Sequence, residues 1–226
     1  MSKQFWIILA AIIVILGGIV FVNNHNKPTA NSSGKPTSHI EGSSPTGATL
    51  IEYGDYQCSV CGTFYPTVKQ IAAKYSKEVV FQFRNLPLTS LHPNAFAAAR
   101  AAEAAGLQGK YWEMHDVLYE NQSGWSTSSD PQATFDSYAK SLQLNIAKFD
   151  TDYASDAVNS AINADLNAFA KTGDEMATPT FYLNGQRLSN MDLIDKNGQP
   201  NVDAFSKVID TILAHKKYTP TPSPGA

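Results

Sequence analysis

The stretch Ile51–Pro66 reads IEYGDYQCSVCGTFYP and holds the two cysteines of the chain, Cys58 and Cys61. The residues before them are strand-like, and the apolar residues after Cys58 keep helical spacing as far as Tyr75. A second strand-like run, EVVFQFR at Glu78–Arg84, follows this helix. The sequence therefore predicts a strand, a helix and a strand, with both thiols placed where the helix begins.

Two cysteines separated by two residues are typical of half a metal site or of a dithiol that cycles with a disulfide. A structural zinc site needs about four ligands, and this chain has no third cysteine. His92 and His115 lie in different predicted segments, and no ligand spacing connects them to the cysteines. We therefore favour the dithiol, expect no bound metal, and assign both histidines structural roles.

The start of a helix favours a reactive thiol. The first sulfur would lie beside unsatisfied backbone N–H groups and the positive end of the helix dipole. These groups favour the thiolate, which is the form that attacks a disulfide. We expect Cys58 to be the exposed nucleophile, and Cys61, about one turn further along, to be the more buried resolving thiol.

Two other residues have two interpretations each. Glu52 precedes Cys58 by six residues in the strand-like run and points either to solvent or into the core. If it points inward, burial raises its pKa, and it exchanges a proton with the buried thiol through water. The Thr178-Pro179 pair enters the strand-like run TFYL, where an ordinary trans proline is the simpler interpretation.

The rest of the chain between these runs is predicted to be helical. The turn Asn184-Gly185 favours a β-hairpin between Thr180–Leu183 and Gln186–Leu188. Among the aromatic and sulfur-containing side chains of this region, we expect Trp112, Trp125 and Met114 to lie in the core. Helices are predicted over the segments 93–106, 109–121, 131–142, 146–171 and 202–216.

The N-terminal part predicts a membrane segment. Residues 5–22 form a run of eighteen residues without charge, and a helix of that length spans roughly 27 Å. We expect an uncleaved transmembrane anchor, with a cleaved signal sequence as the alternative. Residues 1–4 are then a cytoplasmic stub, residues 23–47 a flexible linker, residues 48–217 the folded domain and residues 218–226 a disordered tail.

Composition excludes other classes of protein. A net charge of −3, with both signs mixed along the chain, gives no basic face for nucleic acid. Two cysteines are too few for a secreted scaffold held together by disulfides. A hydrophobic content of 43% is enough to bury the core of one domain.

The order of these features resembles the DsbA-like thiol:disulfide oxidoreductases of the thioredoxin superfamily. The matches are the strand with Glu52, the segment YGDYQCSVC, a helical block, TPTF and a hairpin. LHPNAFAAARAAEAAG and GKYWEMHDVLYENQ also resemble insertion helices of membrane-anchored members. The resemblance covers about residues 48–216 and implies an α/β thioredoxin fold with an all-helical insertion at about 91–173, preceded by the transmembrane helix and tether.

The resemblance also implies roles for single residues. Cys58 is similar to the nucleophile of the family, Cys61 to its resolving cysteine and Glu52 to its buried carboxylate. Pro179 is similar to a cis-proline beside the dithiol, and the backbone of Thr178 would then pair with an extended substrate strand.

The dipeptide between the cysteines departs from the family pattern. Ser59-Val60 stands where strong oxidases of the family often have Pro-His, whose histidine stabilises the thiolate. The Val60 side chain neither donates a hydrogen bond nor carries a charge. Because about 30 mV of reduction potential corresponds to about 1.4 kcal/mol, the sequence leaves the oxidising power open.

Together these features predict a monomeric, membrane-tethered oxidase with its catalytic domain outside the cytoplasm. Its redox-active disulfide, Cys58–Cys61, needs no further cofactor and is donated to cysteine-containing exported proteins. The resemblance implies a membrane protein that reoxidises the dithiol. The alternatives are a thiol reductase or isomerase of the same fold and, in another class, a membrane-tethered binding, chaperone or metal-delivery module.

Overall fold

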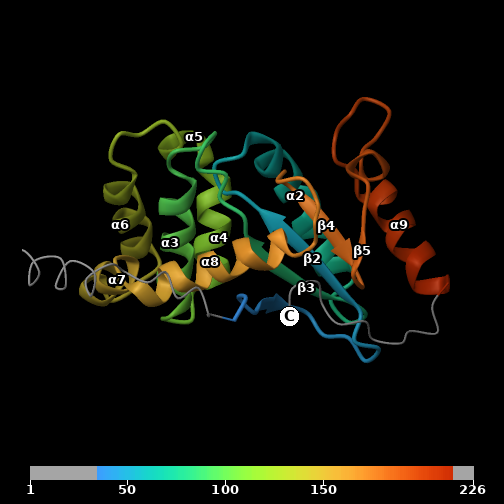
Figure 1. Ribbon diagram of the computed structural model, residues 1–226, viewed down its shortest axis with the longest axis horizontal. Helices are drawn as coiled ribbons and strands as arrows, with labels where there is room; N and C mark the ends of the chain where they lie inside the picture. Colours follow the sequence, from blue (N-terminus) through green and yellow to red (C-terminus); the bar gives the residue numbers. More distant parts are fainter. Residues whose placement is uncertain (1–34, 216–226) are drawn as a thin grey trace, which may run out of the picture. The chain divides into compact units, whose positions relative to one another are not determined.

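The computed structural model describes residues 35–215 (Figure 1). The expected stub at 1–4, the expected anchor at 5–22 and the expected tail at 218–226 lie outside the described residues. Within residues 35–215, no helix is both long enough and apolar enough to cross a membrane.

One mixed sheet forms the centre of the described residues, with the strand order β1-β3-β2-β4-β5. β2 and β3 are parallel, and the helix α2 connects them, whereas the other neighbouring strands are antiparallel. The predicted strand, helix, strand unit is therefore confirmed. The elements are β1 (His39–Glu41), β2 (Thr49–Gly54), α2 (Ser59–Lys74), β3 (Val80–Asn85), β4 (Thr180–Leu183) and β5 (Gln186–Arg187).

Both faces of β2 are covered, so its side chains are buried on alternate sides. Leu50 belongs to the main core together with Phe64 of α2 and Phe205 of α9 (Val202–His215). Tyr53 points to the opposite face, where its ring centroid lies 5.0 Å from that of Phe169. This two-sided burial explains why apolar side chains of β2 point to both faces of the sheet.

The chain between β3 and β4 is helical, as predicted, and Figure 1 shows α3 to α7 gathered beside the sheet. Trp125, Phe135 and Phe149 are fully buried among these helices. The 3-10 helix η1 (Asn190–Leu193) follows β5 and leads toward α9. The inserted helices are α3 (Ala95–Gly106), α4 (Tyr111–Glu120), α5 (Gln122–Trp125), α6 (Pro131–Ser141), α7 (Ile146–Tyr153) and α8 (Asp156–Ala170).

The single helix predicted over residues 146–171 is wrong, because the chain breaks it into α7 and α8. Ser155 has an extended backbone, with φ −77° and ψ 149°, and its side chain accepts a hydrogen bond from the backbone N–H of Val158. Serine in this arrangement caps a new helix rather than continuing the old one.

The flexible linker predicted over residues 23–47 is wrong in its described part, because β1 belongs to the sheet. His39 pairs with Phe83 in the antiparallel register of β1 with β3. Thr37 is buried, and both its backbone N–H and its hydroxyl donate to the Asp165 carboxylate at 2.7 Å. Thr37 lies two residues before β1, so the Asp165 carboxylate of α8 anchors the polar segment that leads into this edge strand.

Candidate active site

The two cysteines lie at the start of α2, as predicted. Cys58 is the capping residue, with an extended backbone at φ −67° and ψ 120°. The side chain of Gln122, from α5, donates to the carbonyl oxygens of Tyr56 at 2.7 Å and of Cys58 at 2.9 Å. A side chain of the inserted helices therefore fixes the backbone of the loop that presents the dithiol.

Cys58 has the more acidic thiol. Its pKa is lowered from 9.0 to about 5, first by a hydrogen bond from the Cys61 thiol, while burial opposes the change. The Thr178 side chain and the backbone N–H groups of Cys61 and Val60 lower it further. The direction of this pKa shift agrees with the thiolate expected at the helix start, although the largest single cause is the neighbouring thiol.

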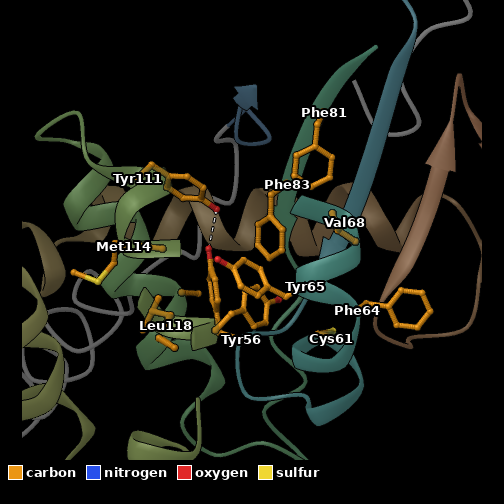
Figure 2. Packing of buried hydrophobic residues seen from close by; sticks show 14 of the residues in the cluster. Tyr56, Cys61, Phe64, Tyr65, Val68, Phe81, Phe83, Tyr111, Met114 and Leu118 are labelled. Carbon is orange, nitrogen blue, oxygen red and sulfur yellow. Dashed lines mark hydrogen bonds between the residues drawn. The ribbon is translucent and has the colours of Figure 1, made fainter. Parts of the chain in front are cut away.

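The expected exposure of Cys58 is wrong, because only 7% of this residue is accessible to solvent. Cys61 is still more enclosed, with 0% exposed, so the expected difference between the two thiols is confirmed. Figure 2 shows Cys61 on α2 within the apolar cluster that includes Phe64. Burial and the hydrogen bond to Cys58 raise the pKa of Cys61 well above 9.0.

Glu52 points into the core, so the alternative in which it points to solvent is wrong. It is 3% exposed and lies in register between Phe83 of β3 and Phe181 of β4. Burial, followed by the negative charge of Cys58, raises its pKa to about 8. Glu52 therefore keeps its proton at neutral pH and is the buried acid next to the dithiol.

The Thr178-Pro179 peptide bond is cis, as the resemblance implied, and not the trans bond of the simpler interpretation. The Thr178 carbonyl oxygen lies 3.6 Å from Cys58 Sγ. The Thr178 hydroxyl is buried, and no residue within 35–215 forms a hydrogen bond with it. This hydroxyl is therefore available to donate to the Cys58 thiolate. The Asn190 side chain donates to the Pro179 carbonyl at 2.8 Å and holds this loop from the other side.

The dipeptide between the cysteines lies at the surface. Ser59 is exposed and Val60 is 49% exposed. Neither side chain brings a positive charge to Cys58, so the thiolate depends on neutral hydrogen-bond donors.

Sequence reasoning missed the carboxylate of Asp55, which is fully buried three residues before Cys58. It accepts hydrogen bonds from the backbone N–H groups of Gln57 at 2.7 Å and of Leu88 at 2.9 Å. His92 Nδ1 lies 2.7 Å from the same carboxylate. Aspartate is common in turns, so the sequence gives no signal for a special role of Asp55. Its contacts with Leu88 and His92 appear only once the β3–α3 loop is folded against it.

His115 is buried, in agreement with the structural role expected for it, and burial lowers its pKa to about 3. Its Nδ1 lies 3.1 Å from the Tyr56 hydroxyl, which itself donates to the Tyr111 hydroxyl at 3.2 Å, the bond dashed in Figure 2. The neutral ring is thus a hydrogen-bonded part of the aromatic core. Across residues 35–215, no three His, Cys, Asp or Glu side chains are grouped so that they could hold a metal ion.

Fold and site define a thioredoxin-fold protein that carries a helical insertion and a dithiol at a helix start. The chain belongs to the thioredoxin family, whose sequence profile matches residues 34–211. Solved structures with a similar fold include BdbD from Bacillus subtilis in its oxidised form, which is 22% identical with a TM-score of 0.63 and covers 80% of this chain and 97% of its own. Another is alpha-DsbA1 from Wolbachia pipientis, which is 20% identical with a TM-score of 0.63 and covers 82% of this chain and 96% of its own. The expected DsbA-like fold is confirmed.

Curated relatives carry a different name. The Na(+)/H(+) antiporter NhaA 1 of Salinispora arenicola is 33% identical over 182 residues, and NhaA 3 of Salinispora tropica is 34% identical over 182 residues. Each alignment covers 80% of this chain but 26% of the relative. The chain therefore spans about a quarter of the length of these antiporters.

Proposed function

We propose that this protein is an extracytoplasmic thiol:disulfide oxidoreductase that introduces disulfides into exported proteins. The observation that carries the proposal is the pair of unequal thiols, in which the pKa of Cys58 is lowered to about 5 while that of the buried Cys61 is raised. One thiol of such a pair is a good leaving group, and the other keeps its proton until it is needed.

The reaction begins with a client thiolate that attacks Sγ of Cys58 in the Cys58–Cys61 disulfide. A bond forms between the client sulfur and Cys58, the bond to Cys61 breaks, and Cys61 leaves as a thiolate. Glu52, protonated at neutral pH, gives its proton to this buried thiolate. A second client thiolate then attacks the client sulfur of the mixed disulfide, which releases Cys58 as a thiolate. The client dithiol is oxidised and the enzyme disulfide is reduced.

Stabilisation of the Cys58 thiolate favours the oxidase direction. It lowers the free energy of the reduced enzyme and has no counterpart in the disulfide form, so the reduction potential rises. In this proposal, the backbone of Thr178 receives an extended client segment beside Cys58, by the strand-addition mode known for exposed peptide groups. A membrane protein restores the disulfide, and residues 5–22 keep the enzyme at the membrane.

A reductase is the second candidate, and the observation that favours it is the partly exposed Val60. A histidine at this position would add a positive charge beside the thiolate, and valine adds none. The less the thiolate is stabilised, the lower the reduction potential of the pair becomes.

Equilibration in glutathione buffers separates the two directions. The protein is incubated at a series of ratios of reduced to oxidised glutathione, and free thiols are counted after acid quenching and alkylation. An oxidase is half-reduced at a potential more positive than that of thioredoxin, about −270 mV. A midpoint at or below that value would refute the oxidase and favour the reductase.

Trapping tests the assignment of the nucleophile. Cys61→Ser leaves Cys58 without its resolving partner, so mixed disulfides with reduced client proteins are expected to accumulate. Cys58→Ser is the matched control and should accumulate none. Equal trapping by both variants would contradict the order of attack.

A further inference from the structure

Tyr119 carries a buried hydroxyl close to the dithiol. The residue is 6% exposed, and within residues 35–215 its hydroxyl has no hydrogen-bond partner. Its ring stacks on Tyr65, with centroids 5.2 Å apart and planes 24° apart, and packs against Tyr56 at 5.0 Å. A buried hydroxyl without a partner is unfavourable, and phenylalanine would fill the same space without that penalty. The oxygen therefore requires an explanation of its own.

The hydroxyl lies against the end of β2. A Cβ atom placed on Gly54 would be 3.1 Å from the Tyr119 oxygen and 2.4 Å from the Phe83 ring. The missing side chain of Gly54 thus leaves a space that the Phe83 ring fills and that the Tyr119 hydroxyl borders. Glu52 stands two residues earlier in β2, so its side chain lies on the same face of the sheet as this space.

The groups that act on the hydroxyl are those of the redox site. After burial, Cys61 of α2 and Glu52 of β2 contribute most to the raised pKa of Tyr119, followed by Tyr56 and Asp55 of the β2–α2 loop. None of these four groups is a cation. Tyr119 therefore keeps its proton and is a hydrogen-bond donor beside two groups that exchange one.

We propose that Tyr119 is a positioning residue for proton transfer between Glu52 and Cys61. Its hydroxyl donates a hydrogen bond, directly or through one water molecule, to the Glu52 carboxylate that exists after Cys61 has taken the proton. The proposal rests on the proposed function and adds one residue to it. The proton moves from the Glu52 carboxyl to the Cys61 thiolate and returns when Cys61 attacks a mixed disulfide, while Tyr119 keeps its own proton throughout.

The structure suggests Tyr119→Phe, which removes one oxygen and preserves the ring contacts. Loss of a donor to the carboxylate is expected to raise the pKa of Glu52 by about one, which is a tenfold gain in proton affinity. Carbon-13 NMR of the Glu52 carboxyl carbon measures this directly in the folded protein. Tyr75→Phe is the matched control. Tyr75 lies at the C-terminal end of α2, away from the dithiol, and its hydroxyl donates to Asp210 at 2.7 Å. This control should leave the Glu52 titration unchanged.

Kinetics give a second readout that a merely structural role would not move. In Tyr119→Phe, the pH profile for attack of Cys61 on a preformed mixed disulfide should move upward by about one pH unit. The pH profile of Cys58 alkylation in the reduced protein should stay in place. In a Glu52→Gln background, Tyr119→Phe should have no effect on the pH profile of Cys61 attack, because the carboxylate that Tyr119 positions is absent.

An unchanged Glu52 titration in Tyr119→Phe would overturn the inference. If that variant does not fold, the wild-type protein still provides a test: the Cζ resonance of Tyr119 should shift as Glu52 ionises near pH 8. The absence of any such response would also overturn it. Both NMR measurements need no thiol exchange, so a protein without exchange activity refutes the proposed function, whereas an unchanged titration refutes only this step.

Discussion

Lowering the pH from 7 to 5 is expected to destabilise the reduced protein relative to the oxidised one. The pKa of the Cys58 thiol falls from 9.0 to about 5 in the folded state, so the folded thiolate is favoured wherever the unfolded thiol is still protonated. This contribution is complete above pH 9 and is lost as the pH falls through 5. At pH 7, two units above the folded pKa, it amounts to about 2.7 kcal/mol. At pH 5 less than about 0.5 kcal/mol remains.

The comparison of redox forms isolates this thiol. The pKa of Glu52 is raised from 4.5 to about 8, so Glu52 removes stability as the pH rises between these values. That loss occurs in both redox forms and largely cancels when their free energies of unfolding are subtracted. The assay is urea denaturation of both forms between pH 5 and pH 8, before the unfolded thiols ionise. Reduced Cys58→Ala serves as a control and should lack the contribution of the thiolate.

The expected gain of about 2.7 kcal/mol at pH 7 corresponds to about 60 mV in reduction potential relative to a dithiol with ordinary thiols. A difference between the redox forms that stays constant from pH 5 to pH 8 would refute the reasoning. It would mean that Cys58 titrates as a free cysteine and that its surroundings give the protein no oxidising power.

Three further substitutions test other parts of the structure. Glu52→Gln is expected to raise the free energy of unfolding at pH 7 by about 3 kcal/mol, because the buried carboxyl with its pKa of about 8 keeps a proton that the unfolded chain releases. The gain should shrink to about 1 kcal/mol at pH 5, and equal gains would contradict this account. Asp165→Asn should speed hydrogen exchange at the Thr37 amide, since one of the two oxygens that accept from Thr37 becomes a donor; unchanged exchange at this amide would argue against it. His115→Phe should remove about 3 kcal/mol of acid destabilisation between pH 7 and pH 4, because the pKa of His115 is lowered from 6.5 to about 3. An equal loss in the wild type and this variant, measured by denaturation, would exclude His115 as its source.

The dithiol is the part of the site that local sequence predicts best. Cys58 and Cys61 lie where a strand-like run changes to helical spacing, and these patterns depend on neighbours only a few residues apart. The lowered pKa of Cys58 was expected on the same grounds, since backbone N–H groups at a helix start exist wherever a helix starts. The strength of the effect depends on the Cys61 thiol and on Thr178, which is 120 positions away.

The orientation of Glu52 needed the sheet. Alternation along a strand offers two directions, and the residues near Glu52 do not choose between them. The choice follows from the pairing of β2 with β3 and β4, which places Glu52 between Phe83 and Phe181. The resemblance to a known family anticipated this result, whereas periodicity alone left it open.

Polar contacts between distant segments are where the sequence misleads. Residues 35–47 have the composition of a linker, yet Thr37 donates twice to Asp165, and His39 lies 2.9 Å from Glu103. Composition describes only residues that are neighbours in the chain. It cannot show that Asp165 and Glu103, on distant helices, are partners for this segment.

From the sequence alone follow the two thiols, the elements on each side of them and the helical block, because short-range spacing encodes all three. Only the tertiary structure shows that Glu52 is the buried acid, that Asp55 and Gln122 hold the dithiol loop, and that the Tyr119 hydroxyl lies against Gly54. Burial and hydrogen bonding depend on which distant segments fold together, and these two effects set the proton affinities on which thiol exchange relies.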